Sequence, residues 1–246
     1  FRIWTTKLRV GFTKLFDRQL MKQTYLNWSS GKDAALAYYF LKNNSDYNVS
    51  KLVTTLNKEA SRVSMHGLQE SLLDAQADSM GLPLQKIYLP EETSMQVYNS
   101  KMKKATQKLI SEGFTHAAFG DIFLEDLKKY REEQLQKVGL QSIFPLWKKD
   151  TSSLMKQFLK LGFKAITVCV NAKLLDKSFV GREVNEQFLN DLPDTVDPCG
   201  ENGEFHTFVY DSPIFNHPIS FKIGEKVLKG YSPSRNNDDD CFTDDT

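Results

Sequence analysis

The chain has 246 residues, of which 40% are apolar and 26% are charged, and its formal net charge is +1. This length is enough for one large domain or two small ones with a buried core. No apolar run approaches the length of a membrane span, and the near-balanced charge gives no basic field for gripping nucleic acid. We therefore expect a globular protein without a membrane partner and without a strong nucleic-acid signal.

Charge is unevenly distributed at the two ends of the chain. Residues 1–20 carry five basic residues against one acidic residue, and Met21 leads directly into the first apolar segment, as a natural start would. We expect 1–20 to be a leader or a non-native extension outside the fold. Residues 232–246 carry five aspartates against one arginine and little apolar content, which predicts a disordered acidic tail.

The cysteines are few and widely separated. They form no C-x-x-C pair, and an odd count without pairs argues against a disulfide framework or a zinc cluster. This usage is typical of a reducing compartment, so we predict a cytoplasmic protein. The cysteines are Cys169, Cys199 and Cys241.

Segments with strand and helix periodicity alternate from Met21 onward. The apolar run 25–28 predicts a first strand, which is followed by a helix that begins near Lys32. Further strands are predicted at 51–56, 84–89, 115–119, 142–146, 165–170 and 205–210. Further helices are predicted at 68–81, 95–109, 154–161 and 184–192.

This alternation predicts an α/β fold with a doubly wound parallel sheet, because parallel strands need crossover helices. Ligands of such sheets bind at the carboxyl ends of the strands, near the point where the strand order reverses. We expect residues 21–140 to form a nucleotide-binding domain. The pattern is less regular afterwards, so we expect 141–231 to form a smaller α/β domain that closes over the first.

The turn Ser29–Asp33 joins the first strand to the first helix. Small residues let backbone N–H groups approach a ligand, the helix start adds partial positive charge, and Lys32 adds a full one, so the turn favours phosphate. It is not the usual G-x-x-x-x-G-K-[ST] loop, because Leu26 stands where the first glycine would and Asp33 follows the lysine. A polar turn with an N-capping serine is the alternative interpretation.

Two segments carry a family resemblance. The turn resembles the S-G-G-x-D-S loop of ATP pyrophosphatases, and residues 200–207 resemble the G-E-N-G-E-[FY]-H-T signature of the diphthine–ammonia ligase family, a branch of that group. Further matches follow the family's order at Ser64–Gly67, Gln76–Ala77, Gly81–Leu84, Phe119–Ile122, Pro145–Trp147 and Gly181–Arg182. The resemblance spans 21–231 and implies an adenine nucleotide alpha-hydrolase-like, Rossmann-like fold with a smaller C-terminal domain.

The resemblance implies ATP-driven amidation. A substrate carboxylate attacks the α-phosphorus to give an acyl-adenylate and pyrophosphate, and ammonia then displaces AMP. In diphthine–ammonia ligases that carboxylate belongs to a modified histidine of a translation elongation factor. The matches in the N-terminal half are more similar to bacterial members, in which the acceptor would instead be a small molecule or cofactor. Mg²⁺ is expected with ATP, held largely by phosphate oxygens.

The family loop assigns roles to residues 29–33. Ser29, Ser30, Gly31 and Lys32 would cradle pyrophosphate, and Asp33 would either orient a Mg²⁺-bound phosphate as the metal ligand or cap the helix. Ser30 replaces a glycine, which is tolerable if its φ is negative. Ala34 replaces a serine and removes one hydroxyl donor, worth about 1–3 kcal/mol. The further nucleotide contacts would be Leu56, His66 and Gly120, although His66 also fits a packed or exposed histidine.

The remaining chemistry falls on acidic residues. Asp121 would reach substrate, metal or ammonium, unless it is only a turn aspartate. Ammonium must lose a proton before it attacks, and we favour Glu204 as the base, with His206 positioning either Glu204 or the adenylate. Solvated acids in a hairpin loop are the alternative interpretation. Expected substrate-binding residues are Glu201, Asn202 and Thr207.

Two alternative functions remain open. The Ala34 change favours a nucleotide-binding or sensing module with little turnover. Cys199 is expected to be structural, but a thiolate of low pKa at this position would permit ATP-dependent sulfur transfer to tRNA.

Overall fold

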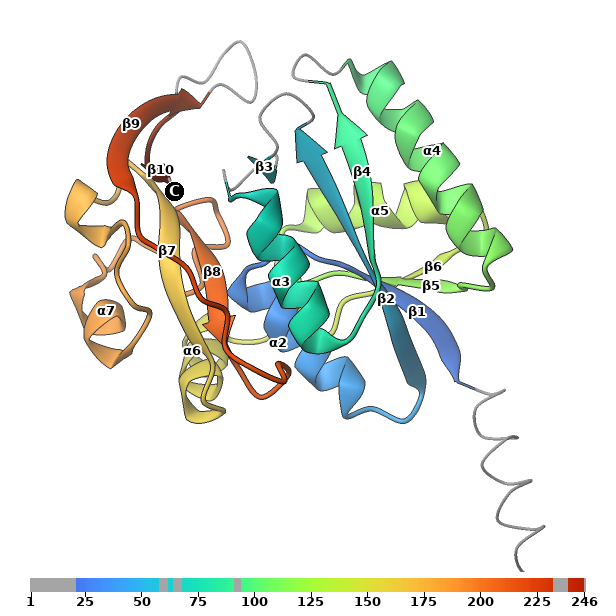
Figure 1. Ribbon diagram of the computed structural model, residues 1–246, viewed down its shortest axis with the longest axis horizontal. Coiled ribbons are helices and arrows are strands. Elements are labelled where there is room, and N and C mark those ends of the chain that lie inside the picture. The colour runs from blue at the N-terminus through green and yellow to red at the C-terminus, as the bar shows by residue number, and fades with distance from the viewer. Residues whose placement is uncertain (1–20, 58–61, 64–67, 91–93, 232–238, 246) are drawn as a thin grey trace, which may run out of the picture.

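The computed structural model describes residues 21–57, 62–63, 68–90, 94–231 and 239–245. Over these ranges the chain forms a six-stranded sheet and a four-stranded sheet that lie side by side (Figure 1). The leader expected over 1–20 and the predicted ligand His66 lie outside the described residues. No helix within the described ranges combines the length and apolar content that a membrane crossing requires.

The central sheet is parallel apart from one short strand. Its parallel strands lie in the order β4-β2-β1-β5-β6, and the two-residue β3 pairs antiparallel with the end of β2. The strands are β1 (Lys22–Asn27), β2 (Tyr47–Asn57), β3 (Arg62–Val63), β4 (Leu84–Leu89), β5 (His116–Ala118) and β6 (Gln141–Ile143). This confirms the predicted doubly wound sheet. The order reverses between β1 and β5, which is where such sheets bind ligands.

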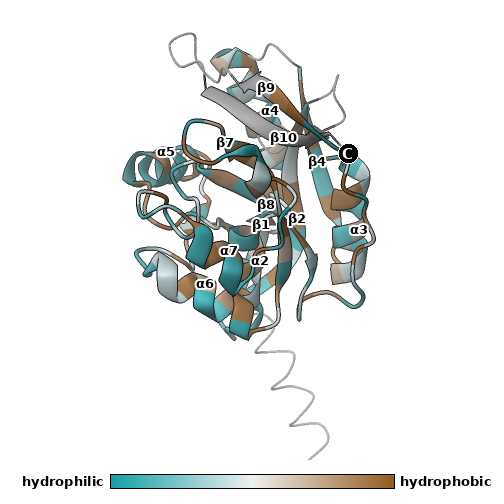
Figure 2. Ribbon diagram, turned by 90° about the vertical axis from the view of Figure 1, so that its left-hand side faces the viewer, coloured by the Kyte–Doolittle hydropathy of each residue, from teal (hydrophilic) through white to brown (hydrophobic). Residues whose placement is uncertain are grey.

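Helices cover both faces of this sheet. Residues of α2 (Lys32–Lys42) and α3 (Glu70–Met80) belong to one apolar core, and those of α4 (Met95–Ser111) and α5 (Glu125–Gln136) belong to a second. Figure 2 shows hydrophobic and hydrophilic bands on α3, as expected of an amphipathic helix. The sequence did not predict α5, because its charged residues leave little apolar periodicity.

The four-stranded sheet is antiparallel, with strand order β8-β7-β10-β9. Its elements are β7 (Lys164–Asn171), β8 (Phe205–Asp211), β9 (Glu225–Tyr231) and β10 (Asp239–Asp245), with α6 (Thr151–Lys160), the 3₁₀ turn η1 (Lys177–Phe179) and α7 (Glu186–Asp191). Phe205 and Phe208 of β8 are fully buried in the same apolar core as α2 and α3. The two sheets therefore share one core, and β8 is held against the helix that follows β1.

Two expectations about the C-terminal half need correction. Strand β6 pairs with β5, so the domain boundary expected between residues 140 and 141 falls inside the central sheet. The tail expected to be disordered contains β10, which pairs with both β7 and β9 over 239–245. Main-chain hydrogen bonds build a strand whatever the charge of its side chains, so an acid-rich composition gave no signal for it.

Candidate functional site

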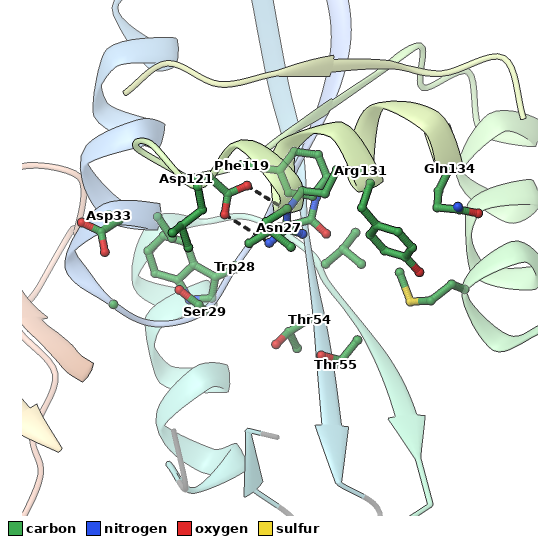
Figure 3. Close-up of a pocket in the computed structure, with 18 of the residues that line it drawn as sticks. Asn27, Trp28, Ser29, Asp33, Thr54, Thr55, Phe119, Asp121, Arg131 and Gln134 are labelled. Atoms are coloured by element: carbon green, nitrogen blue, oxygen red, sulfur yellow. Dashed lines mark hydrogen bonds and ion pairs between the residues drawn. The ribbon is translucent and has the colours of Figure 1, made fainter. Parts of the chain in front are cut away.

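A cavity of about 590 Å³ opens at the carboxyl edge of the central sheet. It is bounded by the ends of β1, β2 and β5, by the turn before α2, by α4 and α5, and by the start of β8. Figure 3 shows side chains from β1, the turn before α2, β2, the segment after β5 and α5 around the cavity, with Asp33 at one end and Gln134 at the other. The cavity thus lies at the reversal of strand order between β1 and β5, as the fold predicts.

The turn between β1 and α2 forms one wall of the cavity and is backed by β8. The backbone N–H of Lys32 donates to Thr207 Oγ1 at 3.1 Å. A side chain at Gly31 would come within 3.2 Å of the Thr207 carbonyl oxygen, so glycine permits the close packing of the two segments. The second sheet therefore braces the turn that was predicted to bind phosphate.

Ser30 does not have the negative φ under which a serine would be tolerable at this position. Its φ is +69°, in the left-handed region that glycine adopts without cost. The residue is fully buried, and its carbonyl oxygen accepts hydrogen bonds from Val209 N and from Gln76 Nε2, each at 3.1 Å. These contacts hold a serine where the related loop has glycine, at a cost of about 1–2 kcal/mol.

Ser30→Gly is expected to stabilise the protein. Relief of the left-handed strain of about 1–2 kcal/mol outweighs the roughly 0.4–1 kcal/mol lost to greater freedom of the unfolded chain. The midpoint of thermal unfolding should rise by about 1–4 °C. Ser29→Gly is the matched control, because Ser29 does not have a positive φ and gains nothing from glycine. A lower midpoint for Ser30→Gly than for the wild-type protein would contradict this account.

Lys32 and Asp33 form an ion pair at the head of α2. Lys32 Nζ lies 2.8 Å from Asp33 Oδ2 and 5.5 Å from the centre of the Phe205 ring. The Lys32 side chain is 4% exposed. Burial lowers the pKa of Lys32, but the negative charge of Asp33 and Glu201 outweighs burial and raises the pKa above its ordinary value. The ammonium group therefore persists at neutral pH and adds a full charge to the helix N-terminus.

The carboxylates at this end of the cavity do not form a metal cage. Among the described residues, no group of three or more His, Cys, Asp or Glu side chains could hold a metal ion. Asp33, the predicted metal ligand, lines the cavity at the phosphate-favouring turn. One carboxylate combined with phosphate oxygens is the donor set that Mg²⁺ commonly takes at nucleotide sites, so Asp33 fits that metal.

The loop after β5 packs directly on the start of α2. A side chain at Gly120 would lie 2.8 Å from the Asp33 carbonyl carbon and 2.9 Å from Ala34 N, so glycine is required for this approach. The next residue, Asp121, pairs with Arg131 of α5 across the cavity wall (Figure 3). Sequence reasoning missed Arg131 because it missed α5.

The Glu204 carboxylate is hydrogen-bonded within the loop that precedes β8. Its carboxylate accepts hydrogen bonds from Asp197 N at 3.1 Å and from Asn202 N and Asn202 Nδ2 at 2.9 Å each. Glu204 is 2% exposed and is not among the residues that line the cavity. This placement does not fit the base predicted at Glu204. The residue instead organises the acidic loop.

Glu201 faces the cavity and spans the two parts of the site. Its Oε1 accepts a hydrogen bond from Ile122 N at 2.7 Å, in the loop after β5. Burial raises the pKa of Glu201 to about 7. Of the two glutamates in the acidic loop, Glu201 therefore has both the position and the pKa of a general base.

Two further residues near the loop titrate outside the neutral range. His206 lines the cavity, and burial lowers its pKa to about 4, which makes the imidazole neutral at pH 7. Cys199 is buried, its Sγ lies 3.5 Å from the Thr151 carbonyl oxygen, and burial raises the pKa of its thiol. A thiolate of low pKa is therefore contradicted, and with it the basis for sulfur transfer.

Besides Glu204, three predicted site residues do not line the cavity, namely Ser30, Leu56 and Asn202. Leu56 is fully buried in the core on the α2 side of the sheet, and Asn202 is exposed at the loop surface, where it bonds to Glu204. At the end of β2 the cavity is lined instead by Thr54 and Thr55 (Figure 3). Because these two hydroxyl residues stand at the end of a predicted strand, the sequence could have indicated them as site residues. Ser29, Gly31, Lys32, Asp33, Gly120, Asp121, Glu201, His206 and Thr207 do line the cavity.

Comparison with known proteins gives consistent matches over both halves of the chain. A family model described as the diphthamide synthase N-terminal domain matches residues 21–142, and one described as the diphthamide synthase C-terminal domain matches 150–232. The diphthine–ammonia ligase of Danio rerio is 27% identical over 178 residues, which cover 63% of this chain and 67% of that protein. The Homo sapiens ligase is 26% identical over 175 residues, covering 63% and 64%. The Schizosaccharomyces pombe ligase is 33% identical over 100 residues, covering 39% and 16%, so the chain spans less than two thirds of the last two relatives.

Proposed function

The chain belongs to the diphthamide synthase family, and on that premise we propose that it is an ATP-dependent ligase that forms an amide from a carboxylate and ammonia, with release of AMP and pyrophosphate. One observation carries the proposal. A phosphate-favouring turn with the buried cation Lys32 and a glutamate with a pKa of about 7, Glu201, face the same cavity. Adenylation needs the turn and Lys32 to bind the phosphates, and the use of ammonium needs Glu201 to accept a proton.

The turn would bind the leaving pyrophosphate. Ser29, Gly31 and Lys32 line the cavity, where backbone N–H groups and the ammonium can neutralise phosphate charge. Asp33, beside Lys32, would hold Mg²⁺ together with the phosphate oxygens of ATP. The metal would supply further neutralisation of charge when bound. Lys32, fixed by its ion pair, needs no rearrangement when negative charge develops on the leaving group.

Glu201 would accept the proton that ammonium must lose. Its pKa of about 7 is close to the pH at which a base is most effective in the cell. His206, neutral at this pH, would position the adenylate without adding charge. Thr207 would act indirectly, because its hydroxyl holds the backbone of Lys32.

The acceptor we propose is diphthine on an elongation factor, because the relatives are named diphthine–ammonia ligases. Ammonium is the second substrate, and the cytoplasm is the proposed location. Membership of the bacterial branch stays a prediction. We also propose that the nucleotide-binding part extends through β6 and that the closing part begins with α6.

The wild-type protein should produce AMP and pyrophosphate when it is incubated with ATP, Mg²⁺, ammonium and an elongation factor that carries diphthine. AMP formation should depend on both the factor and ammonium, because each takes part in one half of the reaction. Chromatography of labelled nucleotide checks this. ADP as the product would contradict the proposal. Tight ATP binding without turnover would support the second candidate, a nucleotide-binding module, which the buried Ala34 favours by supplying no hydroxyl.

A further inference from the structure

Arg131 is held in a fixed orientation in the cavity wall. Its guanidinium lies over the Phe119 ring, with Cζ 4.3 Å from the ring centre. Nη2 donates to Asp121 Oδ1 at 3.2 Å, and Nε lies 2.8 Å from Asp121 Oδ2 in the same ion pair. All three residues line the cavity, and Figure 3 shows the Asp121–Arg131 contacts beside Phe119. The ring contact and the two contacts with the Asp121 carboxylate together hold the guanidinium in place.

This arrangement uses one edge of the guanidinium. A guanidinium has five N–H donors in a rigid fork, and Asp121 occupies the edge formed by Nε and Nη2. The second edge, formed by Nη1 and Nη2, matches another carboxylate in a bidentate geometry. The Arg131 side chain lines the cavity and is 30% exposed.

The position of the pair relates it to the phosphate-favouring turn. Asp121 directly follows Gly120, whose backbone packs against Asp33 and Ala34 with no room for a side chain. A carboxylate bound at Arg131 would therefore lie on the cavity wall that adjoins the head of α2. Lys32, at the adjoining turn, is the cation that the proposed function assigns to pyrophosphate.

We propose that Arg131 binds the carboxylate of the acceptor through its second edge, and that Asp121 is a positioning residue that holds the guanidinium ready. The inference rests on the proposed function, and it names the group that recognises the chemical class of the acceptor, a carboxylate brought next to the nucleotide phosphates. Asp121 is thereby given a role different from direct contact with substrate, metal or ammonium.

Arg131→Lys keeps the charge and removes the planar fork, so it is the sharpest test. The probe is an elongation factor that carries diphthine. The KM for this factor in AMP formation should rise about 10- to 100-fold, because a charge-assisted pair loses one of its two hydrogen bonds and its orientation. The KM for ATP and the affinity for α,β-methylene ATP should stay within about twofold. Asp121→Asn should raise the KM for the factor less than Arg131→Lys does.

Arg182 provides a matched control. It also pairs with an aspartate, Asp191, at 2.5 Å and lies over the rings of Phe179 and Phe188, but it does not line the cavity. Arg182→Lys should leave the KM for the factor unchanged, and thermal unfolding of both variants shows whether they fold.

A binding measurement tests the inference even if the protein does not form AMP. Affinity for the factor is measured in the presence of α,β-methylene ATP, where Arg131→Lys should weaken binding by a similar ratio. A factor that binds the wild-type protein and Arg131→Lys equally, or that binds neither, overturns the inference. A loss of ATP affinity in Arg131→Lys also overturns it, since the guanidinium would then contact phosphate. If the wild-type protein binds the factor in an Arg131-dependent way but makes no AMP, the proposed function is contradicted and the inference about Arg131 is not.

Discussion

Lys32→Met should reduce AMP formation by about 10²- to 10³-fold, the loss expected when one fixed group that stabilises developing charge is removed. The effect is large because Lys32 is buried at the head of α2, where solvent cannot replace its charge. The affinity for ATP should fall as well. Steady-state kinetics with labelled ATP and calorimetric titration with α,β-methylene ATP measure the two effects separately.

Loss of folding must be separated from loss of function in this experiment. Lys32→Met leaves Asp33 without its partner, so the unfolding midpoint should fall. The double variant Lys32→Met/Asp33→Asn removes both charges and should recover much of the midpoint while AMP formation stays low. Lys42→Met is the matched control in the last turn of the same helix, away from the cavity. Normal AMP formation by Lys32→Met would show that the turn does not bind pyrophosphate.

Glu201→Gln should reduce ammonia-dependent AMP release by about 10²- to 10⁴-fold, the range for a positioned general base. The amide keeps an oxygen that can accept from Ile122 N, so the loop contact survives. In the wild-type protein the rate should rise with pH through about 7, as Glu201 loses its proton. The Glu201→Gln variant should lack the part of this rise that comes from Glu201. Its residual rate should follow only the concentration of free ammonia.

Glu204→Gln is the control that distinguishes the two glutamates of the loop. Both Glu204 oxygens accept hydrogen bonds from N–H donors, so an amide nitrogen there would face a donor and cost about 1–3 kcal/mol. We expect a lower unfolding midpoint with the rise in rate near pH 7 retained. If Glu204→Gln removed that rise and Glu201→Gln retained it, the assignment of the base would be reversed.

The same glutamate predicts a change in stability with pH. The pKa of Glu201 is raised from 4.5 to about 7 on folding, so the folded protein holds this proton more tightly than the unfolded chain. The contribution of Glu201 to stability therefore falls as pH rises between these two values. Glu201→Gln removes this cost, and at pH 8 it should be more stable than the wild-type protein by about 1–3 kcal/mol. Near pH 4.5 the two proteins should unfold at similar temperatures.

The architecture of the central sheet was predictable because it is encoded locally. Alternating strands and helices specify a parallel sheet, and the turn between the first strand and Lys32 must then lie at the carboxyl edge. The block 200–207 identified the family without any knowledge of the fold. The helix α5 was missed because its charged sequence buries few residues, and the strand β10 was missed because backbone pairing provides its contacts.

The roles within the site depended on contacts between residues far apart in the chain. The sequence placed Glu201 and Glu204 in one acidic loop, but only the folded loop turns Glu204 inward to Asp197 and presents Glu201 to Ile122. The positive φ of Ser30 is imposed by hydrogen bonds from Gln76 and Val209. Local patterns determine which segments form and where they end. Tertiary packing decides which side chains remain facing the cavity, because a carboxylate satisfied by its own loop has no capacity left for a ligand.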